Sequence, residues 1–318
     1  YGLMIKGGTP VIQGISPGEA GFASDMFRVF DVAGMSPDEF SDMLRTNGIS
    51  FNPQISVSDM RITGSAPVSR LSLLLKSLLS LSRDRNYNRA RFDYYRKCEE
   101  VRLKTAGISA EDRLGRMISP DYRYSEIRNP ESLGRDLPTR VGRYLDWQFS
   151  RINDGILVIV GDFKEEELQK ILIRSLGNFN VGKSTQVRSR VSRDTRQGWY
   201  TSTFPGEACV AMSYSIRNPF SMDGYMTFRI ASVALQKEIV KALAEEAMYA
   251  EFKENIEFYP EEEYTMTVKC RPCNIDGLPS VVVEQRLYRA LDAVRAAVNR
   301  LSSTEITPSE LQAYKAVV

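Results

Sequence analysis

The sequence predicts an α+β protein made of two tandem, homologous units, each a mostly antiparallel sheet covered on one face by helices. The length of 318 residues suffices for two hydrophobic cores of about 150 residues each. Short alternating apolar runs, typical of strands, separate longer stretches that carry apolar residues at helical spacing. The order strand, helix, helix, hairpin, proline, helix, helix occurs over residues 3–103 and again from residue 208. The second copy lacks counterparts of a helix at 141–149 and a strand at 156–160, so we expect it to be truncated at its C-terminus.

Caps and turn residues mark the predicted elements of the first unit. Ser36, Pro37 and Glu39 form a capping-box pattern at a helix start, and Asn47-Gly48 is typical of a left-handed helix end. The expected elements are a strand or two over 3–13, helices over 16–33 and 36–46, a hairpin over 49–62, helices over 71–79 and 92–103, an irregular stretch over 115–134, a helix over 141–149, a buried strand over 156–160 and a helix over 165–176.

The second unit repeats this order after a polar, basic stretch. We expect residues 1–183 to form the first unit, 184–198 a solvated linker rather than a polyanion site, and 199–318 the second unit. Its expected elements are a strand over 208–215, helices over 225–241 and 242–248, strands over 249–258 and 264–269, a long helix over 281–301 and a helix that starts at Thr307.

Composition and charge exclude several classes of protein. The chain has 42 Lys and Arg against 40 Asp and Glu, a net charge of +2, with 26% charged and 42% hydrophobic residues. Such a composition is that of a globular protein, and the charge balance gives no reason to expect a nucleic-acid partner. The longest relevant apolar run, residues 156–160, is far too short to span a membrane. The sequence begins at Tyr1 without a leader pattern, so we expect a targeting peptide to be absent or already removed.

The chain contains no histidine, which restricts the chemistry that it can perform alone. Ser-His-Asp and Cys-His nucleophilic sites and every His-ligated zinc site are excluded for this chain by itself. Of the four cysteines, only Cys270 and Cys273 have a motif spacing, in the run Cys-Arg-Pro-Cys. A redox dithiol has its first cysteine at a helix N-terminus, whereas Cys270 ends a predicted strand, so we expect incidental thiols rather than a redox or metal site.

Two further patterns carry weaker signals. Residues 177–184 match the phosphate-binding pattern G-x-x-x-x-G-K-[ST], but they follow a predicted helix rather than a buried strand, which argues against nucleotide binding. Acidic clusters occur at 165–167, 245–246 and 261–263; the first suits a helix N-terminus, and the others suit solvated surfaces. A glycosidase-type carboxylate pair stays open, although nothing singles out two of the 40 acidic residues.

Several stretches carry a resemblance to a known family: residues 21–28, 36–40, 47–50, 64–66, 160–163 and the helix over 165–176 followed by Gly-Asn-Phe at 177–179. Together they resemble the insulinase/pitrilysin-type zinc peptidases, over nearly the whole chain. The resemblance is greatest to the non-catalytic C-terminal half of the bacterial periplasmic zinc proteases of this family. It implies paired α+β units that form a half-chamber, two such halves closing over a peptide.

In that family the active half carries H-x-x-E-H on its first helix, where two histidines and a downstream glutamate hold zinc and the first glutamate is the general base. The matching positions here are Ser24, Phe27 and Arg28. None of these side chains replaces an imidazole or the catalytic carboxylate. The resemblance therefore implies no metal ligand, cofactor-binding residue or catalytic residue in this chain, with zinc in the partner half.

The family's other half often supplies an Arg and a Tyr to the substrate from a run close to L-R-E-E-x-G-x-x-Y. The corresponding run here is residues 243–251, with Ala244 at the Arg position and Glu251 at the Tyr position. Tyr249 lies two places earlier and is the candidate for a substrate contact.

The resemblance implies two alternative functions. The first is the non-catalytic half of an insulinase-like zinc-dependent endopeptidase, inactive alone, whose partners are a zinc-bearing N-terminal half or subunit and a peptide substrate. The second is a catalytically inactive homologue that acts as a peptide-binding or assembly subunit. The resemblance also implies a periplasmic or otherwise extracytoplasmic location. An H-x-x-E-H segment upstream in the full-length gene distinguishes the first function from the second.

Overall fold

The structure is a computed structural model that describes residues 1–119, 122–128, 130–177, 179, 208–244, 246–258, 261–274 and 276–318. It divides into two compact units, Tyr1–Ala106 with Asp121–Arg193, and Gly107–Pro120 with Asp194–Val318. The segment Gly107–Pro120 thus groups with the second unit, although it lies within the range predicted for the first. The predicted boundaries around the linker at 184–198 lie outside the described residues.

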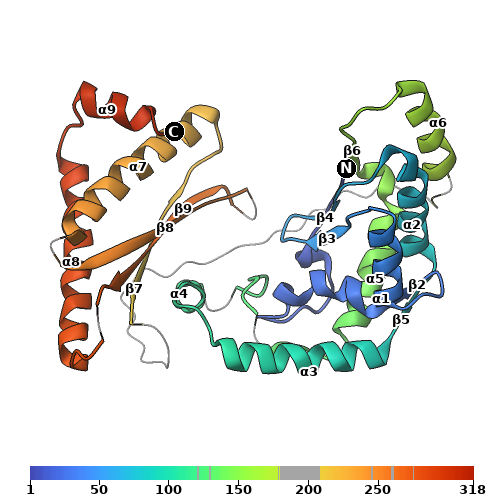
Figure 1. Cartoon of the computed structure of the whole chain (residues 1–318), viewed down its shortest axis with the longest axis horizontal. Helices are drawn as coiled ribbons and strands as arrows, with labels where there is room; N and C mark the ends of the chain where they lie inside the picture. Colours follow the sequence, from blue (N-terminus) through green and yellow to red (C-terminus); the bar gives the residue numbers. More distant parts are fainter. Residues whose placement is uncertain are drawn as a thin grey trace. The chain divides into compact units, whose positions relative to one another are not determined.

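The first unit is built on a four-stranded antiparallel sheet (Figure 1). The hairpin predicted over 49–62 is confirmed as two adjacent strands, and the side chains of Ile5, Met60 and Ile62 are fully buried beneath the helices. Alternation along the strands sends these apolar side chains to one face. The strand order is β3 (Asn52–Ile55), β4 (Asp59–Thr63), β1 (Gly2–Lys6) and β6 (Ile156–Val158).

Helices of the first unit form where the sequence has caps and an apolar stripe. The capping box of Ser36 and Glu39 is present at the start of α1 (Pro37–Thr46). Leu74, Leu75 and Leu78 of α2 (Leu71–Arg83) are buried, as the stripe predicts. A separate pair of short strands, β2 (Phe30–Val32) and β5 (Arg85–Tyr87), lies beside them. The helices are α1 (Pro37–Thr46), α2 (Leu71–Arg83), α3 (Arg89–Ala106), α5 (Leu137–Ser150) and α6 (Glu165–Leu176).

Two predictions for this unit are wrong in detail. The helix expected over 16–33 is replaced by short 3-10 turns at Ala20–Phe22 and Ser24–Val29, after which the chain enters β2. Its apolar spacing fits either structure, because a tightly wound buried segment also needs apolar residues about every third position. The strand β6 is only half-buried: Ile156 and Val158 are 54% and 52% exposed, whereas Leu157 between them packs against the core. Alternation turns these two residues away from the core, and among the described strands β6 pairs only with β1, at the sheet edge.

The second unit repeats the arrangement around a three-stranded antiparallel sheet, β7 (Val210–Arg217), β9 (Glu263–Pro272) and β8 (Met248–Glu257), in that order. In each unit the first strand pairs with the second strand of a hairpin, and the first hairpin strand lies at the edge. The predicted homology of the two units is therefore visible in their topology. Apolar side chains from the sheet and its helices form one core, including Met212, Met266, Val268, Ile239, Leu243, Ala290 and Val294.

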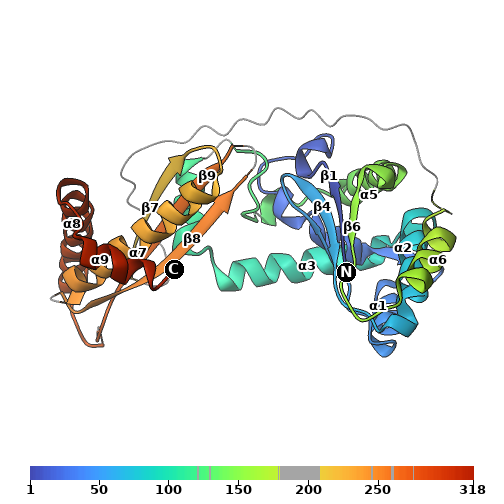
Figure 2. The same cartoon turned by 90° about the horizontal axis from the view of Figure 1, so that it is seen from above.

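Helices α7 (Met222–Ala244) and α8 (Ser280–Ser303) cover one face of this sheet, and Figure 2 shows α9 (Pro308–Lys315) next to α7. The predicted break at residue 241 does not occur: α7 continues to Ala244, and Met248 already belongs to β8. Another helix, α4 (Ala110–Ile118), packs against β7 and occupies part of the stretch expected to be irregular.

The close approach of two loops gives a test of the first unit. A Cβ atom on Gly8 would lie 2.0 Å from the backbone oxygen of Ser56, whereas one on Gly2 would meet only a Thr63 methyl at 3.8 Å. We expect Gly8→Ala to lower the free energy of unfolding by about 1–3 kcal/mol through overpacking, and Gly2→Ala to change it little. Urea denaturation of both variants measures this, and equal stability of the two would contradict the packing described.

Candidate functional site

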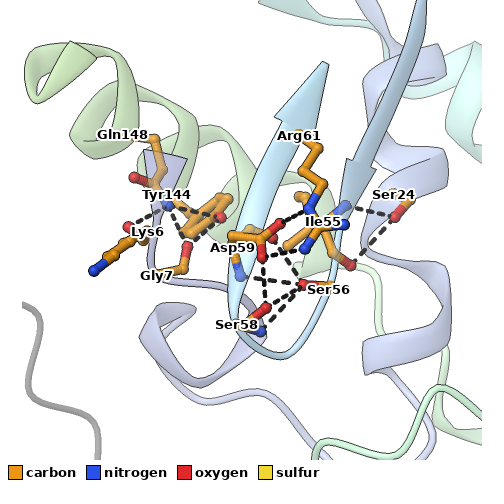
Figure 3. Close-up of polar contacts among 10 residues, drawn as sticks. All are labelled: Lys6, Gly7, Ser24, Ile55, Ser56, Ser58, Asp59, Arg61, Tyr144 and Gln148. Atoms are coloured by element: carbon orange, nitrogen blue, oxygen red, sulfur yellow. Dashed lines mark hydrogen bonds and ion pairs between the residues drawn. The ribbon is translucent and has the colours of Figure 1, made fainter. Parts of the chain in front are cut away.

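Two of the three positions that match the zinc motif, Ser24 and Phe27, have structural roles in the first unit. The Ser24 hydroxyl accepts a hydrogen bond from the backbone N–H of Ile55 at 2.8 Å, at the end of β3 (Figure 3). The Phe27 side chain is 7% exposed and packs in the core, whereas Arg28 is exposed. Ser24 and Phe27 thus have structural contacts within the first unit. Among the described residues no group of three or more Cys, Asp or Glu side chains is placed to hold a metal ion.

A polar network fixes the adjacent loops of the first unit (Figure 3). The Tyr144 hydroxyl donates to the backbone oxygen of Gly7 at 2.7 Å, and the Gln148 amide donates to that same oxygen. Burial raises the pKa of the Tyr144 hydroxyl, so it stays a neutral donor. In the β3–β4 turn, Asp59 accepts from Arg61 at 2.5 Å and from the Ser58 hydroxyl at 2.5 Å. The hydrogen bonds of these side chains go to each other or to the backbone, so we assign them a structural role.

The second sheet presents one polar face, on the side opposite α7 and α8. Residues Met248, Ala250 and Phe252 of β8 pack in the core, so the alternate residues of that strand face the other way. The register brings residues of all three strands onto this open face. Its members are Tyr249, Glu251, Lys253 and Asn255 of β8, Thr265, Thr267, Lys269 and Arg271 of β9, and Ser213 and Ser215 of β7.

Tyr249, Glu251 and Arg271 form a cluster on this open face. The Arg271 guanidinium donates to the Tyr249 hydroxyl at 3.3 Å and lies 3.2 Å from a carboxylate oxygen of Glu251. It also lies 6.0 Å from the centre of the Tyr249 ring, within range of a cation–π interaction. Tyr249 is 42% exposed. The cluster combines hydrogen-bond donors and acceptors with an accessible aromatic ring, which suits contact with a peptide.

The run 243–251 begins at the end of α7 and continues into β8, so its residues lie in different elements. Ala244 is the last residue of α7, and Glu251 is held by Arg271. An Arg–Tyr pair is present nevertheless, because β9 supplies Arg271 directly opposite Tyr249. Sequence reasoning missed Arg271, since the run Cys-Arg-Pro-Cys drew attention to its cysteines. The predicted strand over 264–269 stopped short of Arg271, whereas β9 extends to Pro272.

The helix α4 covers part of the open face. Its Glu111 carboxylate lies 3.3 Å from the ammonium of Lys269, which is 7% exposed. Burial alone would raise the pKa of Glu111, but backbone hydrogen bonding and the Lys269 charge outweigh it and lower that pKa. The Glu111 carboxylate therefore stays charged, and its pair with Lys269 fixes α4 on the sheet. The rest of the face, toward β8, carries the Tyr249 cluster.

The cysteines give no sign of a redox pair among the described residues. Cys270 is fully buried beneath the helices, and burial raises its pKa to about 12. Cys273 lies in the turn after β9, where its backbone N–H donates to the Ala247 oxygen. A buried thiol with a raised pKa is a poor nucleophile, because the thiolate is the reactive form.

The other sequence patterns fall partly outside the described residues. Helix α6 immediately precedes Gly177, so the phosphate-loop pattern follows a helix, as the sequence indicates; its later residues lie outside the described part of the chain. Glu165, Glu166 and Glu167 form the first turn of α6, which is the predicted position. Within the described part of the chain, none of the helices combines the length and apolar composition needed to cross a membrane.

The two units together define the fold of the insulinase/pitrilysin-type peptidases. The chain is similar to the periplasmic protease PqqL from Escherichia coli, with 15% identity and a TM-score of 0.69 over 98% of this chain and 35% of that protein. It is also similar to pitrilysin, with 12% identity and a TM-score of 0.64 over 97% of this chain and 34% of pitrilysin. A peptidase M16 inactive domain from Pseudomonas fluorescens gives 11% identity and a TM-score of 0.62 over 99% of this chain and 81% of that domain.

The chain thus spans about a third of the length of PqqL and of pitrilysin. Comparison of the sequence with models of known families gives no match, and comparison with curated proteins gives none. At these identities the likeness establishes the fold, and the predicted resemblance is confirmed at that level.

The role of the zinc-motif positions can be tested by substitution. Phe27→Glu places a carboxylate in the core, so we expect it to lower the free energy of unfolding by about 3 kcal/mol or more. Arg28→His changes an exposed side chain and serves as the matched control, with an expected effect within about 0.5 kcal/mol. Thermal or urea denaturation compares the two variants. A stable Phe27→Glu protein would show that this position is not part of the core.

Thiol reactivity tests the cysteine environments. At pH 8 we expect an aromatic disulfide reagent to label exposed Cys98 rapidly and Cys270 only after denaturation, since burial keeps Cys270 protonated.

The raised pKa of Cys270 means that its thiol keeps its proton to a higher pH in the folded state than in the unfolded state. The contribution of Cys270 to stability is therefore intact below the ordinary pKa near 9 and is lost as the pH rises toward about 12. Mass spectrometry of labelled peptides measures the order in which Cys98 and Cys270 react, and labelling of Cys270 before denaturation would contradict its burial.

Proposed function

We propose that this chain is the non-catalytic half of an insulinase-like zinc-dependent endopeptidase and forms the wall of a peptide-enclosing chamber opposite a zinc-bearing half. The observation that carries the proposal is which residues occupy the positions that match the zinc motif, and what those residues contact. Ser24 bonds to a strand backbone, Phe27 fills the core and Arg28 is exposed, while the fold is retained around them. A chain of this fold without the metal site can contribute binding but not the hydrolytic step.

The lengths of similar proteins support this proposal. PqqL and pitrilysin are about three times as long as the region that this chain matches, which leaves room in them for another half. The Pseudomonas fluorescens domain is itself described as inactive. Because PqqL is described as periplasmic, we also propose an extracytoplasmic location for this chain.

The open face of the second sheet is the surface that we assign to the substrate. Tyr249 and Arg271 would contact a peptide held between the halves, with Arg271 kept in place by Glu251. Enclosure excludes water and orients the scissile bond, which lowers the activation barrier without any acid–base role for the wall. The zinc of the partner half would supply the activated water.

A second candidate function is a peptide-binding or assembly subunit that never works with a zinc site. The similarity to a separately folded inactive domain, of which this chain covers 81%, favours it. An H-x-x-E-H segment upstream in the full-length gene supports the first function, and a full-length gene without one supports the second.

Cleavage of a quenched fluorescent peptide library tests the proposal. We expect no turnover by this chain alone, and turnover when it is mixed with the zinc-bearing half, abolished by a chelator. Activity of this chain alone would contradict the argument from the missing histidines. If the mixture shows no turnover although the zinc-bearing half is folded and metal-loaded, the result would favour the second function, a peptide-binding or assembly subunit.

In the active mixture, substitutions separate substrate contact from folding. We expect Tyr249→Ala and Arg271→Ala each to lower kcat/KM by about tenfold, the loss of roughly one contact to substrate. Arg300→Ala is the control, because Arg300 pairs with Glu238 on the helical side of the sheet. Unchanged kcat/KM in the first two variants, with normal melting temperatures, would remove this cluster from the binding surface.

A further inference from the structure

A pocket in the first unit has walls from separate elements: the end of α2, the strands β2 and β5, and α5. Its volume of about 280 Å³ is close to the lower end of the range for small-molecule sites, so it suits a ligand of about one ring. It shares no lining residue with the zinc-motif positions or with the Tyr249 cluster. The lining residues that determine its chemistry are Arg83, Arg85, Tyr87, Thr139, Arg143 and Asp146.

Arg85 holds the walls of this pocket together. Its side chain is 6% exposed, and its guanidinium donates to the backbone oxygens of Leu81 and Gly142, each at 2.8 Å. The same guanidinium is paired with the Asp146 carboxylate. One cation on β5 thus bonds to a carbonyl at the end of α2 and to two positions on α5, which fixes the spacing of these elements. The pocket is therefore formed before any ligand arrives.

The lining of the pocket is positively charged. Three arginines, Arg83, Arg85 and Arg143, stand against the one carboxylate of Asp146, which leaves a net charge of +2. Asp146 is already paired with Arg85. Arg143 is exposed, and no ion pair or hydrogen bond of its side chain is present among the described residues. Its donors are therefore available to a ligand, and a guanidinium can hold a phosphate with two parallel hydrogen bonds.

The start of α5 adds neutral donors and the positive end of a helix dipole. α5 begins at Leu137, and Asp136 before it makes no capping hydrogen bond with its side chain. Thr139, in the first turn, lines the pocket, and no hydrogen bond among the described residues engages its hydroxyl or its backbone N–H. Unpaired donors at a helix N-terminus favour an anion.

An aromatic wall completes the pocket. The Tyr87 ring is 37% exposed and packs edge to face on the Phe30 ring, which also lines the pocket, with 6.4 Å between the ring centres. Burial raises the pKa of the Tyr87 hydroxyl, so this group stays neutral near pH 7. A partly exposed ring can stack on a flat apolar group. The pocket thus combines an anion-binding side with an aromatic side.

We propose that this pocket binds a small aromatic phosphate monoester, with the phosphate held by Arg143 and the start of α5 in the positive potential of Arg85, and with the ring against Tyr87. A phosphate monoester carries a charge of about −2 near pH 7, which matches the net charge of the lining. The inference goes beyond the proposed function, because the pocket lies in the first unit and the surface assigned to the peptide substrate lies in the second.

Isothermal titration calorimetry of the whole chain with three probes tests the proposal. The probes are phenyl phosphate, phenyl sulfate, which has a similar shape but about one negative charge less, and inorganic phosphate, which has no ring. We expect phenyl phosphate to bind at least about tenfold more tightly than either of the others. Equal affinity for phenyl sulfate would overturn the charge match, and equal affinity for inorganic phosphate would overturn the aromatic assignment. A lack of saturable binding of phenyl phosphate would overturn the site itself.

Substitution of Arg143 tests where the phosphate binds. We expect Arg143→Ala to weaken binding of phenyl phosphate by about tenfold. Arg143→Lys keeps the charge but loses the two parallel hydrogen bonds, so we expect a smaller loss of about threefold. Arg70→Ala is the matched control, because Arg70 is also exposed but precedes the opposite end of α2. Unchanged affinity in Arg143→Ala, or an equal loss in Arg70→Ala, would overturn the assignment.

Substitution of Tyr87 tests the aromatic wall. Tyr87→Leu keeps an apolar side chain beside Phe30 but removes the ring, so we expect it to weaken binding of phenyl phosphate about fivefold and to leave inorganic phosphate unaffected. Melting temperatures show whether each variant retains the fold. Unchanged affinity for phenyl phosphate in folded Tyr87→Leu protein would overturn the placement of the ring. None of these results affects the cleavage assay with the zinc-bearing half, whose failure alone contradicts the proposed function.

Discussion

The packing of the segment Ser24–Val29 against the first sheet is the constraint on which the rest of the chain depends. Met26 and Val29 are fully buried and Phe27 nearly so, and burial of each such side chain is worth about 2 kcal/mol. The Ser24 hydroxyl adds a hydrogen bond that satisfies a strand N–H with no other partner in the ladder. Ser24 and Phe27, at positions that the resemblance matches to the zinc motif, thus stabilise the unit.

The edges of the two sheets follow from the same topology but have different chemistry. In both units the first hairpin strand lies at the edge, so β3 and β8 occupy equivalent positions. Pro53 and Ser24 close one edge, whereas β8 has no proline, and no described residue bonds to its outward backbone groups. Exposed edges favour unwanted pairing, and proteins commonly close them. Among the described residues, such closure is present at β3 and not at β8.

Local signals in the sequence predicted much of the fold. The capping box at Ser36 and the apolar stripe of α2 depend on residues close together in the chain, and both are present. The stretch 16–33 was misassigned because spacing alone does not separate a helix from buried 3-10 turns. Whether the strand at 156–160 is buried depends on its neighbours in the sheet, which no local pattern encodes.

The site was harder to predict because it is made by pairing between strands. Tyr249 could be named from a run of nine residues, but its partner Arg271 is 22 positions away and is brought opposite by the register of β8 and β9. A shift of one residue would turn every side chain of β8 to the other face. The alternation that buries Met248, Ala250 and Phe252 is therefore also what exposes Tyr249 and Glu251. The core fixes the register, and the register in turn determines which residues a peptide can contact.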